Sequence, residues 1–225
     1  MFLVFDTETT GIPKRVNGKY PDPTIGANYD NARIIEIAWG VYNQSGKCLK
    51  RRKTLVKYDG AINNSHIHGI TQTMVKTGRD FAEIAQVFMT DLNDVHTIVA
   101  HNIWFDIYVL LSELHRINRK DICGHIRSKQ KADTMRLGCA YLNHHRSYIK
   151  LMDLYNKLYP TNPGRLFTDT NPGHRAMVDV KACALCYHKI CVNIHKTNNN
   201  HTNNHHTNKP HTNKHEPNNH EPNKQ

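Results

Sequence analysis

The sequence predicts an α/β domain built on a mixed sheet. Two observations support this prediction: the first sixty residues read as strands that include a hairpin, and the next part of the chain combines a short strand with amphipathic helices. That order of elements is typical of a sheet covered by helices. A third observation distinguishes residues 195–225 from the rest of the chain: they contain no alanine, cysteine, methionine, aliphatic residue, Phe, Trp or Tyr.

The predicted strands lie near the start of the chain. Residues 2–5 form a continuous apolar run, as expected for a strand buried on both faces. Residues 33–42 and 47–58 read as two strands joined by a turn, which predicts a hairpin. Between the first strand and this hairpin, residues 11–32 are rich in Gly, Pro, Asn and Asp, which predicts a long loop, and loops of that length are often functional.

The predicted helices follow from apolar spacing. Phe81, Ile84, Ala85, Phe88, Met89 and Leu92 form one stripe at helical spacing, so a helix is expected over 80–92. A short strand is expected over 97–100. Further helices are predicted over 107–117, 134–142, 149–158 and 175–194, with a loop at 160–173.

Composition predicts one domain over residues 1–194 and a disordered tail over 195–225, because the tail has too little apolar surface to offset its ordering entropy. The formal net charge is +11, and the tail's four lysines and two glutamates leave +9 on the body. A basic body favours a polyanionic partner, with nucleic acid first. Six scattered cysteines and the lack of a leader-like or membrane-spanning stretch predict an intracellular protein with reduced thiols and no membrane partner; cytoplasm and nucleus are both open.

Asp6 and Glu8 interrupt the apolar character of the first strand. Because side chains alternate along a strand, both carboxylates point to the same side. Two acids held that close repel each other unless a cation or a proton intervenes. Oxygen-only ligation favours Mg²⁺ or Mn²⁺ over Zn²⁺.

Two further acids stand at positions where helices begin. Asp106 ends the stretch HNIWFD, directly after the apolar strand 97–100, where it could also serve as a helix-starting residue. Asp179 ends HRAMVD at the start of the last helix, among apolar residues, and an acid in such surroundings needs a partner.

FDTETTG, HNxxFD and H-x-x-x-x-D, in that order, resemble the three motifs of the DEDDh 3′→5′ exonucleases, the group that contains the proofreading epsilon subunit of bacterial DNA polymerase III. SHIHGIT (65–71) and ADTMRL (132–137) resemble connecting segments of that family. The resemblance covers roughly residues 1–192. It implies a ribonuclease H-like mixed sheet with helices on both faces.

The resemblance assigns catalytic roles to Asp6, Glu8, Asp106, His174 and Asp179. Asp6, Glu8 and Asp179 would hold one divalent metal, and Asp6 with Asp106, in part through water, a second. Two Mg²⁺ ions, with Mn²⁺ able to replace them, would stabilise the attacking and leaving oxygens of phosphodiester hydrolysis. His174 would take the proton of the attacking water, and it should lie before the regular part of the last helix to reach the same site.

Residues for substrate binding also follow from the resemblance. They are expected to hold the 3′-terminal nucleotide, and they are Thr7, Thr9, Thr10, His68, Gly69, Ile70 and Asn102.

The predicted function is a metal-dependent 3′→5′ exonuclease that releases nucleoside 5′-monophosphates from single-stranded or frayed 3′ ends, with DNA favoured. Alternatives are an RNA 3′→5′ exonuclease with the same residues, a non-catalytic nucleic-acid binding module, and an accessory subunit of a separate polymerase. The basic run 50–53 fits a nucleic-acid contact, a localisation signal or charge that protects an edge strand. Cys183 and Cys186 have C-x-x-C spacing, which we interpret as core packing rather than a zinc site.

Overall fold

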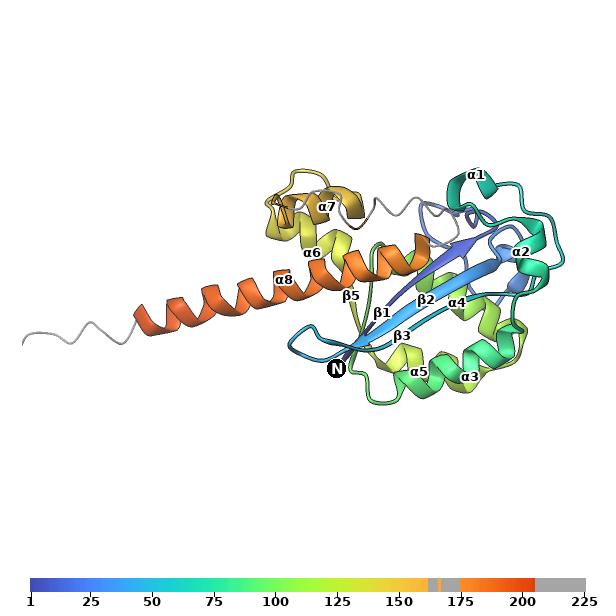
Figure 1. The fold of residues 1–225 in the computed structure, drawn as a ribbon, viewed down its shortest axis with the longest axis horizontal. Coiled ribbons are helices and arrows are strands. Elements are labelled where there is room, and N and C mark those ends of the chain that lie inside the picture. The colour runs from blue at the N-terminus through green and yellow to red at the C-terminus, as the bar shows by residue number, and fades with distance from the viewer. Residues whose placement is uncertain (162–165, 167–174, 205–225) are drawn as a thin grey trace, which may run out of the picture. The chain divides into compact units, whose positions relative to one another are not determined.

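The computed structural model describes residues 1–161, 166 and 175–204. The chain divides into two compact units, Met1–Cys191 and Val192–Gln225. The first unit contains a five-stranded sheet of order β3-β2-β1-β4-β5 (Figure 1). Its strands are β1 (Phe2–Thr9), β2 (Ile34–Tyr42), β3 (Cys48–Leu55), β4 (Thr97–Ala100) and β5 (Gln130–Asp133).

The sheet is mixed, as predicted. β1 pairs antiparallel with β2 and parallel with β4, β2 pairs antiparallel with β3, and β4 pairs parallel with β5. β1 is therefore the middle strand, and its apolar residues face both sides because successive side chains alternate. Leu3 and Phe5 join one apolar cluster, and Phe2 and Val4 join another on the opposite face.

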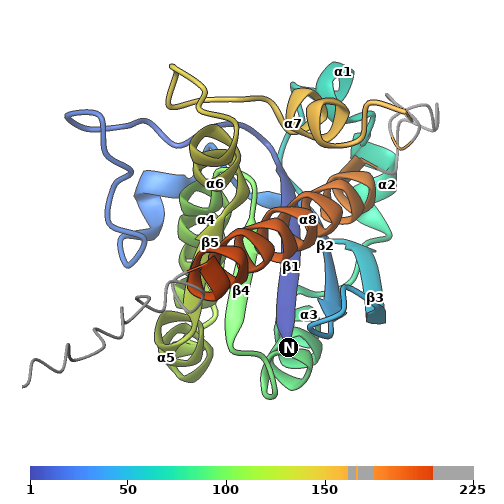
Figure 2. The same ribbon diagram turned by 90° about the vertical axis from the view of Figure 1, so that its left-hand side faces the viewer.

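Helices cover both faces of the sheet (Figures 1 and 2). Their bounds are α1 (Ser65–His68), α2 (Gln72–Lys76), α3 (Phe81–Leu92), α4 (Ile103–Arg116), α5 (Lys120–Ser128), α6 (Thr134–Tyr141), α7 (Leu151–Leu158) and α8 (Arg175–Asn204), with a 3₁₀ turn η1 at Gly26–Tyr29. The apolar sides of α3, α4 and α5 pack on the Leu3 face. The first part of α8 packs on the Phe2 face, and α6 and α7 pack against α8.

Several boundaries differ from the sequence predictions. β1 continues through Asp6 and Glu8 to Thr9, because β2 pairs with it along its whole length. α4 begins at Ile103 rather than 107, since Ile103 is itself buried in the core. α8 extends to Asn204, past the predicted end at 194. Once a helix is nucleated, each added residue contributes a backbone hydrogen bond without needing a packed face.

The sequence did not predict helices α1, α2 and α5, strand β5 or the 3₁₀ turn η1. The segments of α1 and α2 are too short to show a helical period. α5 contains Gly124, a poor helix former, but buries Ile122 and Ile126, one helical turn apart. β5 reads QKAD and is held by its pairing with β4 rather than by an apolar pattern.

The basic run 50–53 is largely engaged within the domain. Lys50 and Arg52 of β3 contact the buried Asp91 of α3 at 2.9 and 2.6 Å, and the indole N–H of Trp39 donates to the same carboxylate at 3.0 Å. These contacts make β3 a strand tied to α3. Cys183 and Cys186 are buried in the apolar clusters around α8, as core packing requires. No helix in the described part of the chain combines the length and apolar character needed to span a membrane.

Candidate active site

Three acids lie close together where the start of α8 packs against β1. Asp6 and Glu8 follow Phe2 and Val4 on the side of β1 that α8 covers, and Asp179 comes from the first turns of α8. One carboxylate oxygen from each of Asp6, Glu8 and Asp179 lies within 4.8 Å of the other two. Residues from opposite ends of the domain thus form one oxygen-rich cluster.

A fourth acid, Asp106, comes from α4 on the other face and interacts electrostatically with Asp6 and Asp179. It is 3 % exposed and lies in the first turn of that helix. Its Oδ1 accepts hydrogen bonds from the backbone nitrogen of Thr7 at 3.0 Å and from Thr7 Oγ1 at 2.7 Å. Burial raises the pKa of Asp106 to about 7, although the hydrogen bonds from Thr7 oppose the rise.

Burial and the neighbouring acids disfavour the ionisation of Asp6 and Asp106. Burial raises the pKa of Asp6 well above its ordinary value, and the charges of Asp106, Asp179 and Glu8 raise it further. A carboxylate cluster with this electrostatic cost fits a divalent cation, which would offset the like charges and prefers oxygen ligands. The donor set of Asp6, Glu8 and Asp179 therefore suits Mg²⁺ or Mn²⁺.

Glu36 is a further buried acid that the sequence prediction missed. It lies in β2 directly opposite Glu8, and its side chain is 1 % exposed. Burial raises its pKa to about 7, an effect opposed by the Lys53 ammonium 3.9 Å away and by the backbone N–H of Ala176 in α8. The available signal was an acid in the middle of the apolar strand RIIEIAWG.

The residues predicted to bind the terminal nucleotide lie near the end of β1. Thr9 Oγ1 donates to the carbonyl of Gly11 at 2.6 Å, and Thr10 Oγ1 accepts from the backbone nitrogen of Arg33 at 3.0 Å. The side-chain amide of Asn64 donates to the carbonyl of Thr9 at 2.9 Å, which ties the α1 segment to the end of β1.

That α1 segment contains the predicted His68, Gly69 and Ile70. His68 and Ile70 are buried, and the backbone nitrogen of Ile70 donates to His68 Nδ1 at 3.0 Å. Gly69 has a φ of 72°, which explains a glycine where α1 ends.

Asn102 precedes α4 and adopts a left-handed conformation with φ of 65°. Its backbone nitrogen donates to Asp133 Oδ1 at 2.9 Å. The same oxygen accepts from the backbone nitrogen of Met135 at 3.0 Å, so Asp133 fixes the turn that presents Asp106. Asp133 was not predicted as a site residue, although it lies in the ADTMRL segment. His174, the predicted base, lies outside the described residues.

The family model of the RNase_T exonucleases, described as "Exonuclease", matches residues 3–187. The chain belongs to this exonuclease family. The four-acid cluster lies within the matched region, and the family places this chain among nucleases.

Curated relatives of this exonuclease are subunits or forms of bacterial DNA polymerase III. The epsilon subunit from Haemophilus influenzae is 30 % identical over 133 residues, 54 % of this chain and 45 % of the relative. A PolC-type polymerase III from Thermotoga maritima is 33 % identical over 143 residues, 63 % of this chain and 9 % of the relative. The chain thus spans less than half the length of these relatives.

Solved structures of other exonucleases share its fold. Escherichia coli exonuclease I in complex with a dT13 oligonucleotide superposes with a TM-score of 0.60 at 16 % identity, covering 90 % of this chain and 42 % of that one. A 3′-exonuclease that recognises the histone mRNA stem-loop gives a TM-score of 0.56 at 14 % identity, covering 84 % and 62 %. The ribonuclease H-like α/β fold predicted from the motifs is confirmed.

Proposed function

We propose that this exonuclease is a metal-dependent 3′→5′ enzyme that releases nucleoside 5′-monophosphates from single-stranded or frayed 3′ ends. The observation that supports this most directly is the convergence of Asp6, Glu8 and Asp179 within 4.8 Å, with Asp106 beside them, in a chain of the exonuclease family.

In this proposal the acids hold two divalent cations, Mg²⁺ with Mn²⁺ as a substitute. Asp6, Glu8 and Asp179 hold one, and Asp6 and Asp106 hold the other. When bound, the cations neutralise the charge that develops on the phosphate during hydrolysis. Thr7 keeps Asp106 oriented, and His174 accepts the proton of the attacking water.

The proposed substrate is DNA, because the curated relatives are DNA polymerase III proteins. RNA stays as the alternative, since one structural neighbour recognises a histone mRNA stem-loop. A proofreading role would require a separate polymerase as partner. The basic body of the chain, at +9, suits either nucleic acid.

The test uses single-stranded DNA and RNA oligonucleotides of one sequence, labelled separately at the 5′ or the 3′ end. With Mg²⁺ or Mn²⁺, we expect a 5′-labelled ladder that shortens stepwise and immediate release of labelled mononucleotide from the 3′ end. Chelator, Asp6→Ala and His174→Ala should each abolish cleavage. Glu83→Gln, an exposed acid on α3, is the matched control and should cut at the parental rate.

Two outcomes would reject the proposal. If Asp6→Ala and His174→Ala degrade the oligonucleotides as fast as the parent, the assignment of the site is wrong. If the parent binds but cuts neither polymer with either metal, a non-catalytic binding module is the better description.

A further inference from the structure

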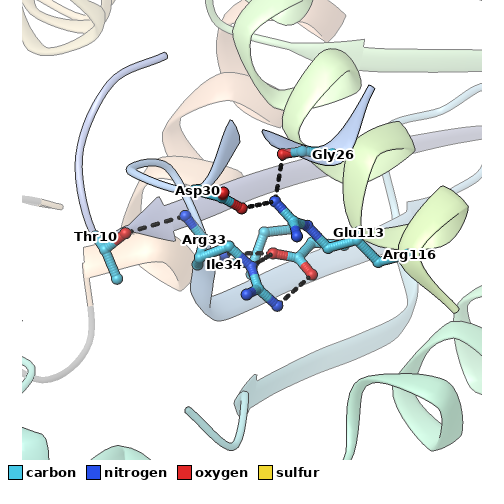
Figure 3. Close-up of polar contacts among 7 residues, drawn as sticks. All are labelled: Thr10, Gly26, Asp30, Arg33, Ile34, Glu113 and Arg116. Atoms are coloured by element: carbon cyan, nitrogen blue, oxygen red, sulfur yellow. Dashed lines mark hydrogen bonds and ion pairs between the residues drawn. The ribbon is translucent and has the colours of Figure 1, made fainter. Parts of the chain in front are cut away.

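The C-terminal end of the long loop 11–32 is anchored to α4 (Figure 3). Arg116 of α4 donates to Asp30 at 2.6 Å and to the backbone carbonyl of Gly26. Just after the loop, Arg33 Nε and Nη2 donate to the two carboxylate oxygens of Glu113 at 2.6 and 3.0 Å. A two-point contact of this kind fixes orientation as well as distance. These contacts hold the C-terminal part of the loop against α4.

A cavity of about 440 Å³ lies between this loop and helices α4 and α5. Tyr20 of the loop and Trp104 and Tyr108 of α4 form its aromatic lining. The ring centroids of Tyr20 and Tyr108 are 5.9 Å apart, and those of Trp104 and Tyr108 are 6.0 Å apart. Trp104 is 43 % exposed, which is unusual for so large an apolar side chain. We refer to this cavity and its lining as the aromatic groove.

Positive charge accompanies the aromatic groove. Arg127, at the end of α5, and Lys131, in β5, line it, and Arg15 stacks over the Tyr20 ring with its guanidinium carbon 4.3 Å from the centroid. Asp22 contributes a single negative charge to the lining. Stacking surfaces bordered by cations are the features with which proteins bind single-stranded nucleic acid, because every base has a π-face and every phosphate is negative.

We propose that the aromatic groove binds the single strand upstream of the 3′ end, with a base stacked on the exposed Trp104 and phosphates beside Arg127 and Arg15. This inference rests on the proposed function and adds to it a second site on the substrate. An unpaired strand is the occupant that fits, because bases in a duplex are already stacked on each other and cannot cover these rings.

The placement of Trp104 sets the distance from the cleavage site. Trp104 and Asp106 are two residues apart on α4, which corresponds to a rotation of about 200° around the helix. The groove and the acid cluster thus lie on opposite sides of the start of α4, separated by roughly the 10 Å width of a helix. A strand that occupies both must pass the N-terminal end of α4. The groove therefore holds nucleotides several positions from the 3′ end, and short substrates cannot reach it.

The chain offers a direct reporter of this binding. Its two tryptophans differ sharply in exposure: Trp39 is 1 % exposed in the core, whereas Trp104 is 43 % exposed in the groove. Quenching of tryptophan fluorescence by an added oligonucleotide reports contact at Trp104. The titration is made with full-length protein in chelator, so that no cleavage occurs, using oligothymidylates from 2 to 12 nucleotides.

We expect the 12-mer to quench the fluorescence and the dinucleotide to leave it unchanged. Trp104→Ala should raise the Kd for the 12-mer about tenfold, measured by anisotropy of a labelled strand, while Trp104→Phe should keep most of the affinity because it keeps a stacking ring. Arg127→Gln should lower the salt dependence of binding by about one phosphate contact. Leu185→Ala, which removes an exposed apolar side chain of α8, is the control and should bind as the parent does.

Equal Kd values for Trp104→Ala and the parent, with circular dichroism unchanged, would overturn the proposal. So would binding of the 12-mer without quenching, or no binding of any oligonucleotide. Failure of the proposed function alone would give a different result. The 12-mer would bind and quench the tryptophan fluorescence in chelator, but it would stay uncut after Mg²⁺ or Mn²⁺ is added.

Discussion

Thr7 and Asp106 are joined by two hydrogen bonds to a single carboxylate oxygen, one from the backbone of β1 and one from the Thr7 hydroxyl. Alternation along β1 turns Thr7 toward α4, while Asp6 and Glu8 on either side of it turn toward α8. One three-residue stretch thus supplies two acids to the cluster and positions a third. Thr7 was predicted from the sequence to contact substrate, and the structure gives it a partner within the protein.

Replacing Thr7 with valine should impair turnover more than substrate binding. Thr7→Val keeps the side-chain shape and removes the hydroxyl donor, and hydrogen bonds to charged groups contribute about 1.5–3 kcal/mol. We expect kcat to fall about tenfold or more while KM for a long oligonucleotide stays the same. Thr7→Ser, which keeps the hydroxyl, should restore most of kcat. A rise in KM alone would instead favour the substrate-binding role.

Divalent cations should stabilise the folded protein through the acid cluster. Binding to the native state alone raises the melting temperature as cation concentration rises. We expect Mg²⁺ or Mn²⁺ to raise Tm for the parent and to raise it less for Asp179→Asn, which keeps only the site of Asp6 and Asp106, measured by differential scanning calorimetry against chelator. Because the substitution removes one of the mutually repelling charges, its Tm in chelator should exceed that of the parent. A metal-induced shift of the same size in Asp179→Asn and the parent would contradict the assigned ligand set.

Glu36 predicts a pH dependence of stability in the metal-free protein. Its pKa is raised from 4.5 to about 7 by burial, so the folded state retains a proton that the unfolded state has lost over that interval. Stability from this group is therefore complete below pH 4.5 and declines as pH rises to about 7, by an amount on the order of 3 kcal/mol. Denaturant unfolding of Glu36→Gln should show a shallower decline than the parent between these pH values. Parallel curves would mean that Glu36 ionises at an ordinary pKa.

The two arginines at the base of the loop 11–32 should differ in their effect on stability. Arg33→Met leaves the buried Glu113 carboxylate, 7 % exposed, without its two-point partner, which should cost about 3 kcal/mol. Arg116→Met removes a contact to Asp30, which is 65 % exposed, and should cost under about 1 kcal/mol. Urea unfolding of the two variants measures both. Equal losses would show that the loop, rather than the buried Glu113, determines the cost.

The sequence predicted the features that leave a local pattern. Burial of residues 2–5 follows from their continuous apolar run, and the stripe of α3 and the common orientation of Asp6 and Glu8 follow from periods of 3.6 and 2 residues. The proximity of Asp6 and Glu8 to Asp179 was predicted from the order of the three motifs, because spacing alone does not show which parts of a chain lie close together. The role of His174 stays a prediction.

The features that were missed depend on tertiary pairing. β5 is a strand because it pairs with the edge of β4. Asp133 contributes to the site because its Oδ1 accepts a hydrogen bond from the backbone of Asn102, thirty-one positions away in the sequence. In the sequence, Glu36 is only a polar residue within an apolar strand. Its position opposite Glu8 becomes known only from the pairing register of β1 and β2. None of these relationships leaves a local period in the sequence.

The split origin of the acid cluster has a consequence for biosynthesis. Asp6 and Glu8 belong to the first strand, whereas Asp179 belongs to the last helix of the sheet-containing unit. The ribosome must therefore synthesise the first turns of α8 before the three carboxylates can meet. A nascent chain that ends before Asp179 can already hold the five strands of the sheet, but its acid cluster is incomplete.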